Sequence, residues 1–320
     1  MHDWQTVGSL GAGQLRAQLK RDGIVFRAGP WIVRLQSDDS DFAELFRWMY
    51  FEAPLATSEA CADITLELRR KHGLRRVIRP QIELKTDREE LLPFTPFPAD
   101  HAFALFEWGM NWCMAISGHT RFMLHAAVLE RYGRCLILPA APGSGKSTLC
   151  AALAVSGWRL FSDEFGLIRI DDLGVVPMPR PIALKNDSIE IIRRFAPSAE
   201  FGPVFPKTRK GDVAHMRPSD AAVRAMDVEG QPAWIVFPTW QAGAATRIEA
   251  FPRGRSFLKL TGNSFNYMLL GADGFRTAAA LASCCDCYTL QYSELPEAVE
   301  VIDQITRSPM RANEKSDVQR

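Results

Sequence analysis

The segment that most constrains this chain is 138–148, which reads LPAAPGSGKST. An apolar stretch, 134–138, leads into it, and the Ala- and Leu-rich stretch 149–154 follows it. A strand, a tight glycine-containing loop and a helix in this order are the context of a phosphate-binding P-loop, because loop N–H groups and the helix N-terminus surround the phosphates. The residues predicted to bind nucleotide phosphates are Pro142, Gly143, Ser144, Gly145, Lys146, Ser147 and Thr148.

Two side chains of this loop have predicted roles. In a P-loop the lysine reaches the β- and γ-phosphates, and the following hydroxyl ligates Mg²⁺. Lys146 and Ser147 occupy those positions, so the expected cofactors are ATP and Mg²⁺. The first motif position is Ala140 instead of glycine, so one residue that tolerates positive φ is missing. The alternative to a P-loop is a Gly/Ser-rich turn that merely begins a helix. This alternative is disfavoured, because an apolar strand precedes the segment and a helical stretch follows it.

Composition excludes several functional classes. The 320 residues are 47% hydrophobic and 23% charged, as in an ordinary soluble protein. The net charge of +1 argues against a nucleic-acid surface, and the longest apolar segment, 103–118, contains Glu107 and is too short to span a membrane. Seven cysteines, an odd number, indicate a reducing cytoplasm, and no signal peptide is expected. Nucleic-acid and membrane partners are not expected, whereas homo-oligomerisation is left open.

The chain divides into three predicted parts. Residues 1–120 have the pattern of a small mixed α+β domain, with a hairpin over 24–35, a helix over 42–50, a strand over 63–68 and a helix over 102–116. Residues 121–305 form the expected P-loop domain. Residues 306–320 are polar and are expected to be a disordered tail.

An acidic pair follows the next predicted strand, 158–162. Asp163 and Glu164 lie shortly after the P-loop helix in sequence. If their strand is the parallel neighbour of 134–138, the pair lies at the carboxyl edge of the sheet beside the phosphates. One carboxylate then deprotonates an attacking hydroxyl and the other holds Mg²⁺. An exposed acidic strand end is the alternative interpretation.

His125 stands in the apolar run 122–128, where a lone histidine is usually a core residue. However, Leu124-His125-Ala126, Tyr132-Gly133, the P-loop and the stretch 159–164 follow one another at characteristic intervals. In this arrangement the chain resembles the catalytic core of the HPr kinase/phosphorylase family, specifically over about 122–170. The whole chain more closely resembles the HprK-related kinase A group. Segments that fit that group are 179–186, 208–215, 265–267 and 287–292.

The resemblance implies a mixed α/β fold shared with phosphoenolpyruvate carboxykinases. It implies Asp163 as catalytic base, Glu164 as the neighbouring metal-side acid and His125 as a phosphate-side histidine. Lys146 and Ser147 match the phosphate and Mg²⁺ positions. Glu164 stands where the family has the second of two aspartates. The segment with which that family binds the protein HPr is not found in this sequence.

Other charged or thiol-bearing segments have weaker interpretations. The basic loop 205–211, with His215 and Arg217 after it, either closes over phosphoryl oxygens or an anionic substrate, or is a solvated loop. Glu190 is either a second metal-side acid or, as favoured here, a surface helix residue. The cysteines of segment 284–287 are expected to be buried structural thiols.

The predicted function is therefore ATP-dependent phosphotransfer with Mg²⁺. The acceptor is a hydroxyl of a small protein, a peptide or a metabolite. The main alternative is a regulatory or assembly subunit that senses ATP without phosphotransfer. A carboxykinase acting on oxaloacetate is disfavoured, because no substrate arginine arrangement is recognisable.

Overall fold

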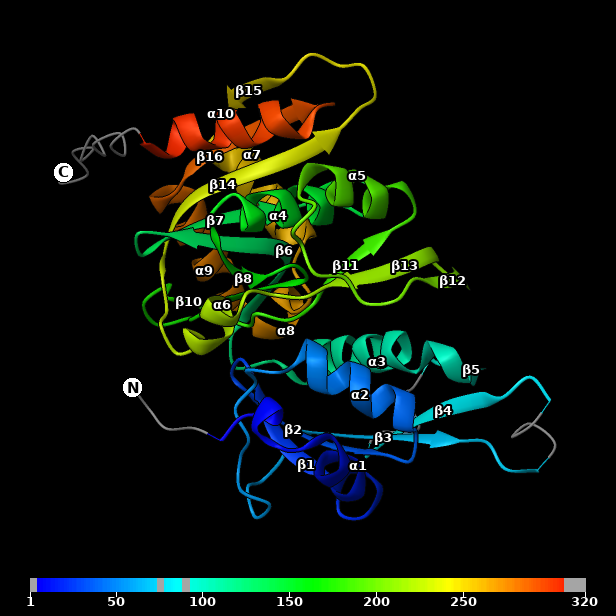
Figure 1. The fold of residues 1–320 in the computed structure, drawn as a ribbon. Coiled ribbons are helices and arrows are strands. Elements are labelled where there is room, and N and C mark those ends of the chain that lie inside the picture. The colour runs from blue at the N-terminus through cyan, green and yellow to red at the C-terminus, as the bar shows by residue number, and fades with distance from the viewer. Residues whose placement is uncertain (1–4, 74–77, 88–92, 308–320) are drawn as a thin grey trace.

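The computed structural model describes residues 5–73, 78–87 and 93–307. The protein is a mixed α/β protein with three sheets of five, eight and three strands, as the sequence predicts at the level of fold class. The five-stranded sheet forms one end of the molecule, and the other two form the remainder (Figure 1). The predicted tail lies outside the described residues, apart from its first two positions.

The five-stranded sheet has the order β1-β2-β3-β4-β5. The hairpin is confirmed: β1 and β2 are antiparallel and turn at Gly29, whose φ is +60°. Buried residues alternate along β2, as in a strand with one face on a core. The strands are β1 (Ile24–Ala28), β2 (Trp31–Ser37), β3 (Ile64–Arg70), β4 (Gln81–Thr86) and β5 (Phe97–Pro98).

The helices of this part include both predicted ones. They are the 3-10 helices η1 (Val7–Ser9) and η4 (Ala99–His101), and the α-helices α1 (Ala12–Lys20), α2 (Ser40–Met49) and α3 (Ala102–Ser117). The carboxylate of Asp39 caps α2 by accepting a 2.8 Å hydrogen bond from Phe42 N. The apolar helix α3 lies between the five-stranded sheet and the rest of the molecule (Figure 1), which explains why it is buried on almost all sides.

The eight-stranded sheet contains the P-loop strand. Its main order is β10-β9-β6-β7-β14-β16-β15, and β8 also pairs with β6. Strands β7, β14 and β16 are parallel, whereas β6 is antiparallel to β7, β8 and β9. The strands are β6 (Phe122–Arg131), β7 (Arg134–Pro139), β8 (Arg159–Ser162), β9 (Phe165–Ile168), β10 (Val175–Val176), β14 (Gln231–Trp240), β15 (Arg247–Ala250) and β16 (Asp286–Tyr292).

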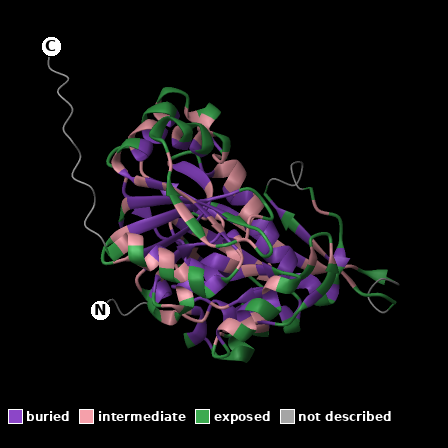
Figure 2. Cartoon of the chain, turned by 90° about the horizontal axis from the view of Figure 1, so that it is seen from above, coloured by how far each residue is buried: buried purple, intermediate pink, exposed green. Residues whose placement is uncertain are grey.

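Helices cover both faces of this sheet. Buried side chains of α4 and α10 join one hydrophobic cluster, and those of α7 and α9 join another. The strands between them form the buried centre of the molecule (Figure 2). The helices are α4 (Lys146–Val155), α5 (Asp187–Phe195), α6 (Asp220–Arg224), α7 (Arg253–Gly262), α8 (Tyr267–Leu270), α9 (Ala272–Cys284) and α10 (Leu295–Arg307).

The three-stranded antiparallel sheet connects the two ends of the molecule. It has the order β11-β13-β12, with β11 (Ile182–Lys185), β12 (Phe205–Thr208) and β13 (Gly211–Met216). Phe205 and Val213 of this sheet belong to the same hydrophobic cluster as Phe103 of α3. The two predicted domains therefore share a core, and the boundary near residue 120 stays a prediction.

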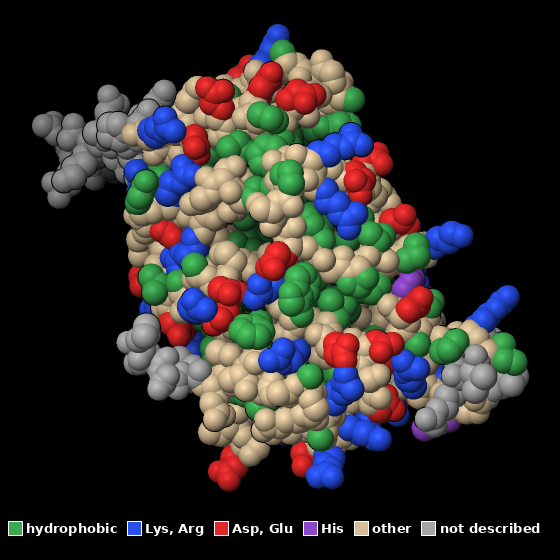
Figure 3. All heavy atoms as spheres, viewed as in Figure 1, with side chains coloured by type: hydrophobic (Ala, Val, Ile, Leu, Met, Phe, Trp, Pro, Cys, Tyr) green, Lys and Arg blue, Asp and Glu red, His purple; other side chains and the backbone are tan. Residues whose placement is uncertain are grey.

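The surface carries both signs of charge. On the face shown in Figure 3, basic and acidic side chains are intermixed. Among the helices of the described ranges, none combines the length and the apolar character that a membrane crossing requires.

Candidate active site

The P-loop begins where β7 ends and finishes at the first residue of α4. Gly143 and Gly145 have φ values of +87° and +84°, so the loop makes two left-handed turns that favour glycine. Ala140 is buried and is not among the residues with positive φ in the described chain. The alanine at the first motif position therefore does not prevent the chain from forming this loop.

The carboxyl ends of two neighbouring strands fix the loop. Trp240 N, at the end of β14, donates a 3.0 Å hydrogen bond to Ser144 O. The hydroxyl of Tyr292, at the end of β16, donates a 3.1 Å hydrogen bond to Gly145 O. A side chain at Gly145 would overlap the Tyr292 hydroxyl and approach Trp240 Cβ to 2.9 Å. Glycine at this position is thus required by space as well as by φ.

The start of α4 presents free hydrogen-bond donors. Within the described residues, the N–H groups of Gly145, Lys146, Ser147 and Thr148 donate no hydrogen bond. The first N–H groups of a helix have no partner inside the helix and suit a phosphate. Ser144 Oγ is buried and also has no hydrogen-bond partner. These groups, with the exposed Pro142 and Gly143 beside them, are the ones that the sequence places in the phosphate site.

The side chain of Lys146 connects this loop to the acidic pair. Its ammonium is buried and donates a hydrogen bond to Asp163 O, and it lies 3.5 Å from Asp163 Oδ1. Burial alone lowers the pKa of Lys146, but the charges of Asp163 and Glu164 outweigh burial and raise it. Lys146 is therefore a permanent cation at neutral pH.

The acidic pair lies at a break between two strands. The expected parallel neighbour of β7 is wrong, because β6 lies between β7 and β8. Strands β8 and β9 follow each other along the same edge of β6, and Asp163 and Glu164 occupy the bend between them. Ala126 N donates a 3.3 Å hydrogen bond to Glu164 O on one side, and Ala126 pairs with Pro139 on the other. The pair therefore faces the start of the P-loop across one strand.

The two carboxylates have different surroundings. Asp163 is 8% exposed, and its Oδ1 is ion-paired with Lys146 at 3.5 Å but accepts no hydrogen bond. This oxygen therefore has room for one further hydrogen-bond donor. Glu164 is half-buried, and its Oε1 lies 3.5 Å from His125 Nε2. Burial raises the pKa of Glu164, but Lys146 and His125 outweigh it and lower the pKa.

His125 completes the predicted group. The backbone N–H of His125 donates a 2.7 Å hydrogen bond to Asn263 O, and the centroid of its ring lies 5.7 Å from that of Phe265. Burial and the charge of Lys146 lower its pKa, against the opposing effect of Glu164. The ring is therefore neutral at pH 7. The structure brings His125, Lys146, Asp163 and Glu164 together, as predicted.

The metal ligands remain candidates. No group of three acidic, histidine or cysteine side chains suited to a metal ion occurs in the described part of the chain. Mg²⁺ is commonly held by one or two carboxylates together with substrate phosphates and water. Ser147 and Glu164 fit that donor set, because Ser147 belongs to the loop whose N–H groups are free and Glu164 lies close enough to Lys146 for that charge to lower its pKa.

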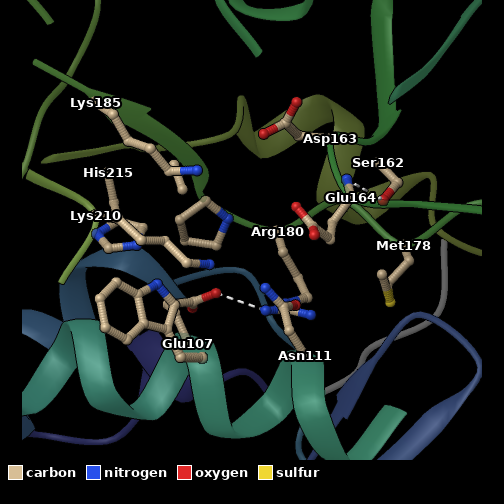
Figure 4. Close-up of a pocket in the computed structure, with 13 residues that line it drawn as sticks. Glu107, Asn111, Ser162, Asp163, Glu164, Met178, Arg180, Lys185, Lys210 and His215 are labelled. Carbon is tan, nitrogen blue, oxygen red and sulfur yellow. Dashed lines mark hydrogen bonds and ion pairs between the residues drawn. The ribbon is translucent and has the colours of Figure 1, made fainter. Parts of the chain in front are cut away.

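A small cavity that opens to solvent adjoins the acidic pair. Its lining comes from both ends of the molecule (Figure 4). The residues that line it are Glu107, Trp108, Asn111, Ser162, Asp163, Glu164, Met178, Arg180, Pro181, Ala183, Lys185, Lys210 and His215. Sequence reasoning missed the contribution of α3, since nothing in the apolar segment 102–117 other than Glu107 and Asn111 marks a site.

A buried ion pair joins the two walls of this cavity. Arg180 Nη2 lies 2.6 Å from Glu107 Oε2, and Tyr50 donates a 2.5 Å hydrogen bond to Glu107 Oε1. All three side chains are buried. Burial lowers the pKa of Arg180, but the charges of Glu107 and Tyr50 outweigh it and the pKa is raised. The pair fixes α3 against the segment before β11.

The basic loop is a hairpin whose members have different positions. Lys210 and His215 line the cavity, whereas Arg217 pairs with Glu200 at 2.7 Å and Asp220 at 2.5 Å. Arg209 donates a hydrogen bond to Thr95. The loop is therefore neither wholly solvated nor wholly part of the site.

Two other sequence interpretations are settled by position. Glu190 is exposed on α5 and pairs with Arg193 at 2.8 Å, so it is a surface residue as favoured. Cys285 and Cys287 are buried free thiols, and Cys284 is half-buried.

Two comparisons with known proteins identify no relative of this chain. No family model matches the sequence, and no curated protein matches it.

Proposed function

We propose that the protein is an ATP-dependent phosphotransferase that moves the γ-phosphoryl group to an acceptor hydroxyl. One observation carries this proposal. The buried carboxylate of Asp163 is ion-paired with the P-loop lysine at 3.5 Å, accepts no hydrogen bond at Oδ1 and lines a cavity that a substrate hydroxyl could enter. A protein that only senses ATP needs no such acceptor of protons. The resemblance to the HPr kinase family, and to the fold that it shares with phosphoenolpyruvate carboxykinases, supports the same conclusion.

Each residue of the site has a separate role in the proposed transfer. The N–H groups at the start of α4 and the ammonium of Lys146 hold the β- and γ-phosphates. Asp163 takes the proton of the acceptor hydroxyl while that oxygen forms a bond to the γ-phosphorus. The bond between the γ-phosphorus and the β–γ bridging oxygen breaks, and its electron pair leaves with ADP. His125, neutral at pH 7, stands beside Glu164 and orients it.

Mg²⁺ would be held by Ser147 and Glu164 and would neutralise the charge that develops on the phosphate oxygens. The buried free thiols Cys113, Cys135 and Cys150 support a reducing compartment, for which we propose the cytoplasm.

The test compares nucleotide binding with turnover. Lys146→Ala is expected to lose Mg-ATP affinity in calorimetry, because the lysine supplies a charge to the phosphates. Asp163→Asn is expected to keep that affinity and to lower the rate of ADP formation by about 10²–10⁴-fold. Asp187→Asn is the matched control, since this exposed residue lies outside the cavity lining. Circular dichroism verifies that each variant is folded.

Two outcomes would change the conclusion. If Asp163→Asn forms ADP at the wild-type rate, Asp163 is not the base. If the wild-type protein binds Mg-ATP tightly and forms no ADP with any acceptor in a labelled-ATP screen, the ATP-sensing alternative holds instead.

A further inference from the structure

The cavity beside Asp163 has two chemically different sides. The carboxylates of Asp163 and Glu164 lie on one side, next to the P-loop. The ammonium groups of Lys185 and Lys210 extend into the space from the other side (Figure 4). Lys185 is the last residue of β11, and Lys210 stands in the turn between β12 and β13. The three-stranded sheet therefore brings both lysines to the same space.

Lys185 and Lys210 are both exposed residues, and the charge of Glu164 in the same lining acts on Lys210. Within the described residues neither ammonium forms an ion pair, whereas Arg180 in the same lining is paired with Glu107 at 2.6 Å. The ammonium of Lys210 lies 5.0 Å from the ring centroid of Trp108 on α3. Burial and the nearby charge of Lys185 lower the pKa of Lys210, against the opposing effect of Glu164. Two like charges that face the same space attract an anion between them.

Unpartnered polar atoms line the same end of the cavity. His215 is fully buried, and neither of its ring nitrogens has a hydrogen-bond partner. Asn111 Oδ1 is likewise buried without a partner. Buried polar atoms usually have partners, so these atoms point to a ligand that supplies donors and acceptors.

We infer that Lys185 and Lys210 form a subsite for the anionic group of the phosphoryl acceptor. The acceptor is then a small hydroxylated molecule that carries a carboxylate or a phosphate monoester. Its anion lies between the lysines, and its hydroxyl reaches Asp163. This inference rests on the proposed function for the direction of the hydroxyl, but the anion subsite itself does not depend on it.

The form of the cavity favours a small molecule. The enclosed space is small, it opens to solvent beside the exposed Lys185 and Lys210, and α3 closes the side away from the P-loop. Transfer to such a molecule gives a phosphate monoester that also carries the original anion. Two negative groups then lie next to the lysines and the P-loop, respectively.

The experiment measures anion binding to the full chain with the P-loop already filled. Calorimetry is carried out with saturating Mg²⁺ and a non-hydrolysable ATP analogue, and the titrants are inorganic phosphate, glycerate and glycerol 3-phosphate. Glycerol is the uncharged control. At least one of the three anions is expected to bind, and glycerol is not. The relative affinities for glycerate and glycerol 3-phosphate distinguish a carboxylate site from a phosphate site.

Variants locate the binding. Lys185→Met and Lys210→Met are each expected to weaken anion affinity by at least about tenfold, as for the loss of a hydrogen bond to a charged group. Lys207→Met is the matched control, because Lys207 is an exposed residue of the same hairpin outside the lining. It is expected to bind like the wild type.

Two results would overturn the inference. One is that no anion binds, or that the lysine variants bind anions as well as the wild type does. The other is that these variants lose affinity for Mg-ATP by the same factor, because the lysines then serve the nucleotide. A wrong proposed function would be recognised by a different result. In that case Asp163→Asn would keep full turnover, and the anion would still bind to the wild type and more weakly to the lysine variants.

Discussion

Gly145 offers a quantitative test of the P-loop geometry. Its φ of +84° places it in the left-handed region, which costs another residue about 1–2 kcal/mol. An alanine there also overlaps the Tyr292 hydroxyl and lies 2.9 Å from Trp240 Cβ, and such overpacking adds about 1–3 kcal/mol. Gly145→Ala is therefore expected to lower the free energy of unfolding by about 2–5 kcal/mol.

Gly143 provides the matched control for this substitution. Its φ of +87° is nearly the same, but no atom lies within 4 Å of a Cβ built there. Gly143→Ala is expected to cost only the backbone contribution, about 1–2 kcal/mol. Urea unfolding followed by tryptophan fluorescence measures both values. If the two variants lose the same free energy, the contact of the loop with Tyr292 and Trp240 does not constrain it.

Two further predictions concern buried charge around the cavity. Glu107→Ala leaves the buried guanidinium of Arg180 without its carboxylate, and we expect a loss of about 3–5 kcal/mol in urea unfolding. The double variant with Arg180→Leu should be more stable than Glu107→Ala alone, and equal stability would show that the unpaired charge is not the cause. Burial lowers the pKa of His215 to about 4, below its ordinary value of about 6.5. Because the unfolded state then binds the proton first, stability is lost as pH falls from about 6.5 to about 4, by about 3 kcal/mol in all. Unfolding measured at pH 7 and pH 5 should show a smaller difference in His215→Asn than in the wild type, and an unchanged difference would refute this assignment.

The local features of the site could be predicted from the sequence. The glycines of 143–145 and the apolar stretch before them determine a strand, a loop and a helix through local preferences. The hairpin at Gly29 and the helix α3 follow in the same way from a turn residue and from periodicity. His125 is recognised only through resemblance, since a histidine in an apolar strand has no local mark of function.

Contacts between residues that are distant in the sequence could not be predicted. Pairing of β8 with β6 instead of β7 depends on which edge of the sheet is free, and one sequence does not encode that in any short pattern. The ion pair of Glu107 with Arg180 joins residues 73 positions apart. Segment 179–186 fits the resemblance, but nothing in it marks Lys185 itself, which becomes notable only because β11 ends at the cavity.

The arrangement of α3 has a consequence for the whole molecule. One side of the cavity is built on the P-loop sheet, and the opposite side is a helix from the first 120 residues. Phe103 of that helix packs on His215, and Glu107 holds Arg180. The N-terminal part therefore shapes the proposed acceptor site, while the P-loop sheet carries the proposed nucleotide site. We expect substitutions on the cavity side of α3 to change which acceptor is used and to leave nucleotide binding unchanged.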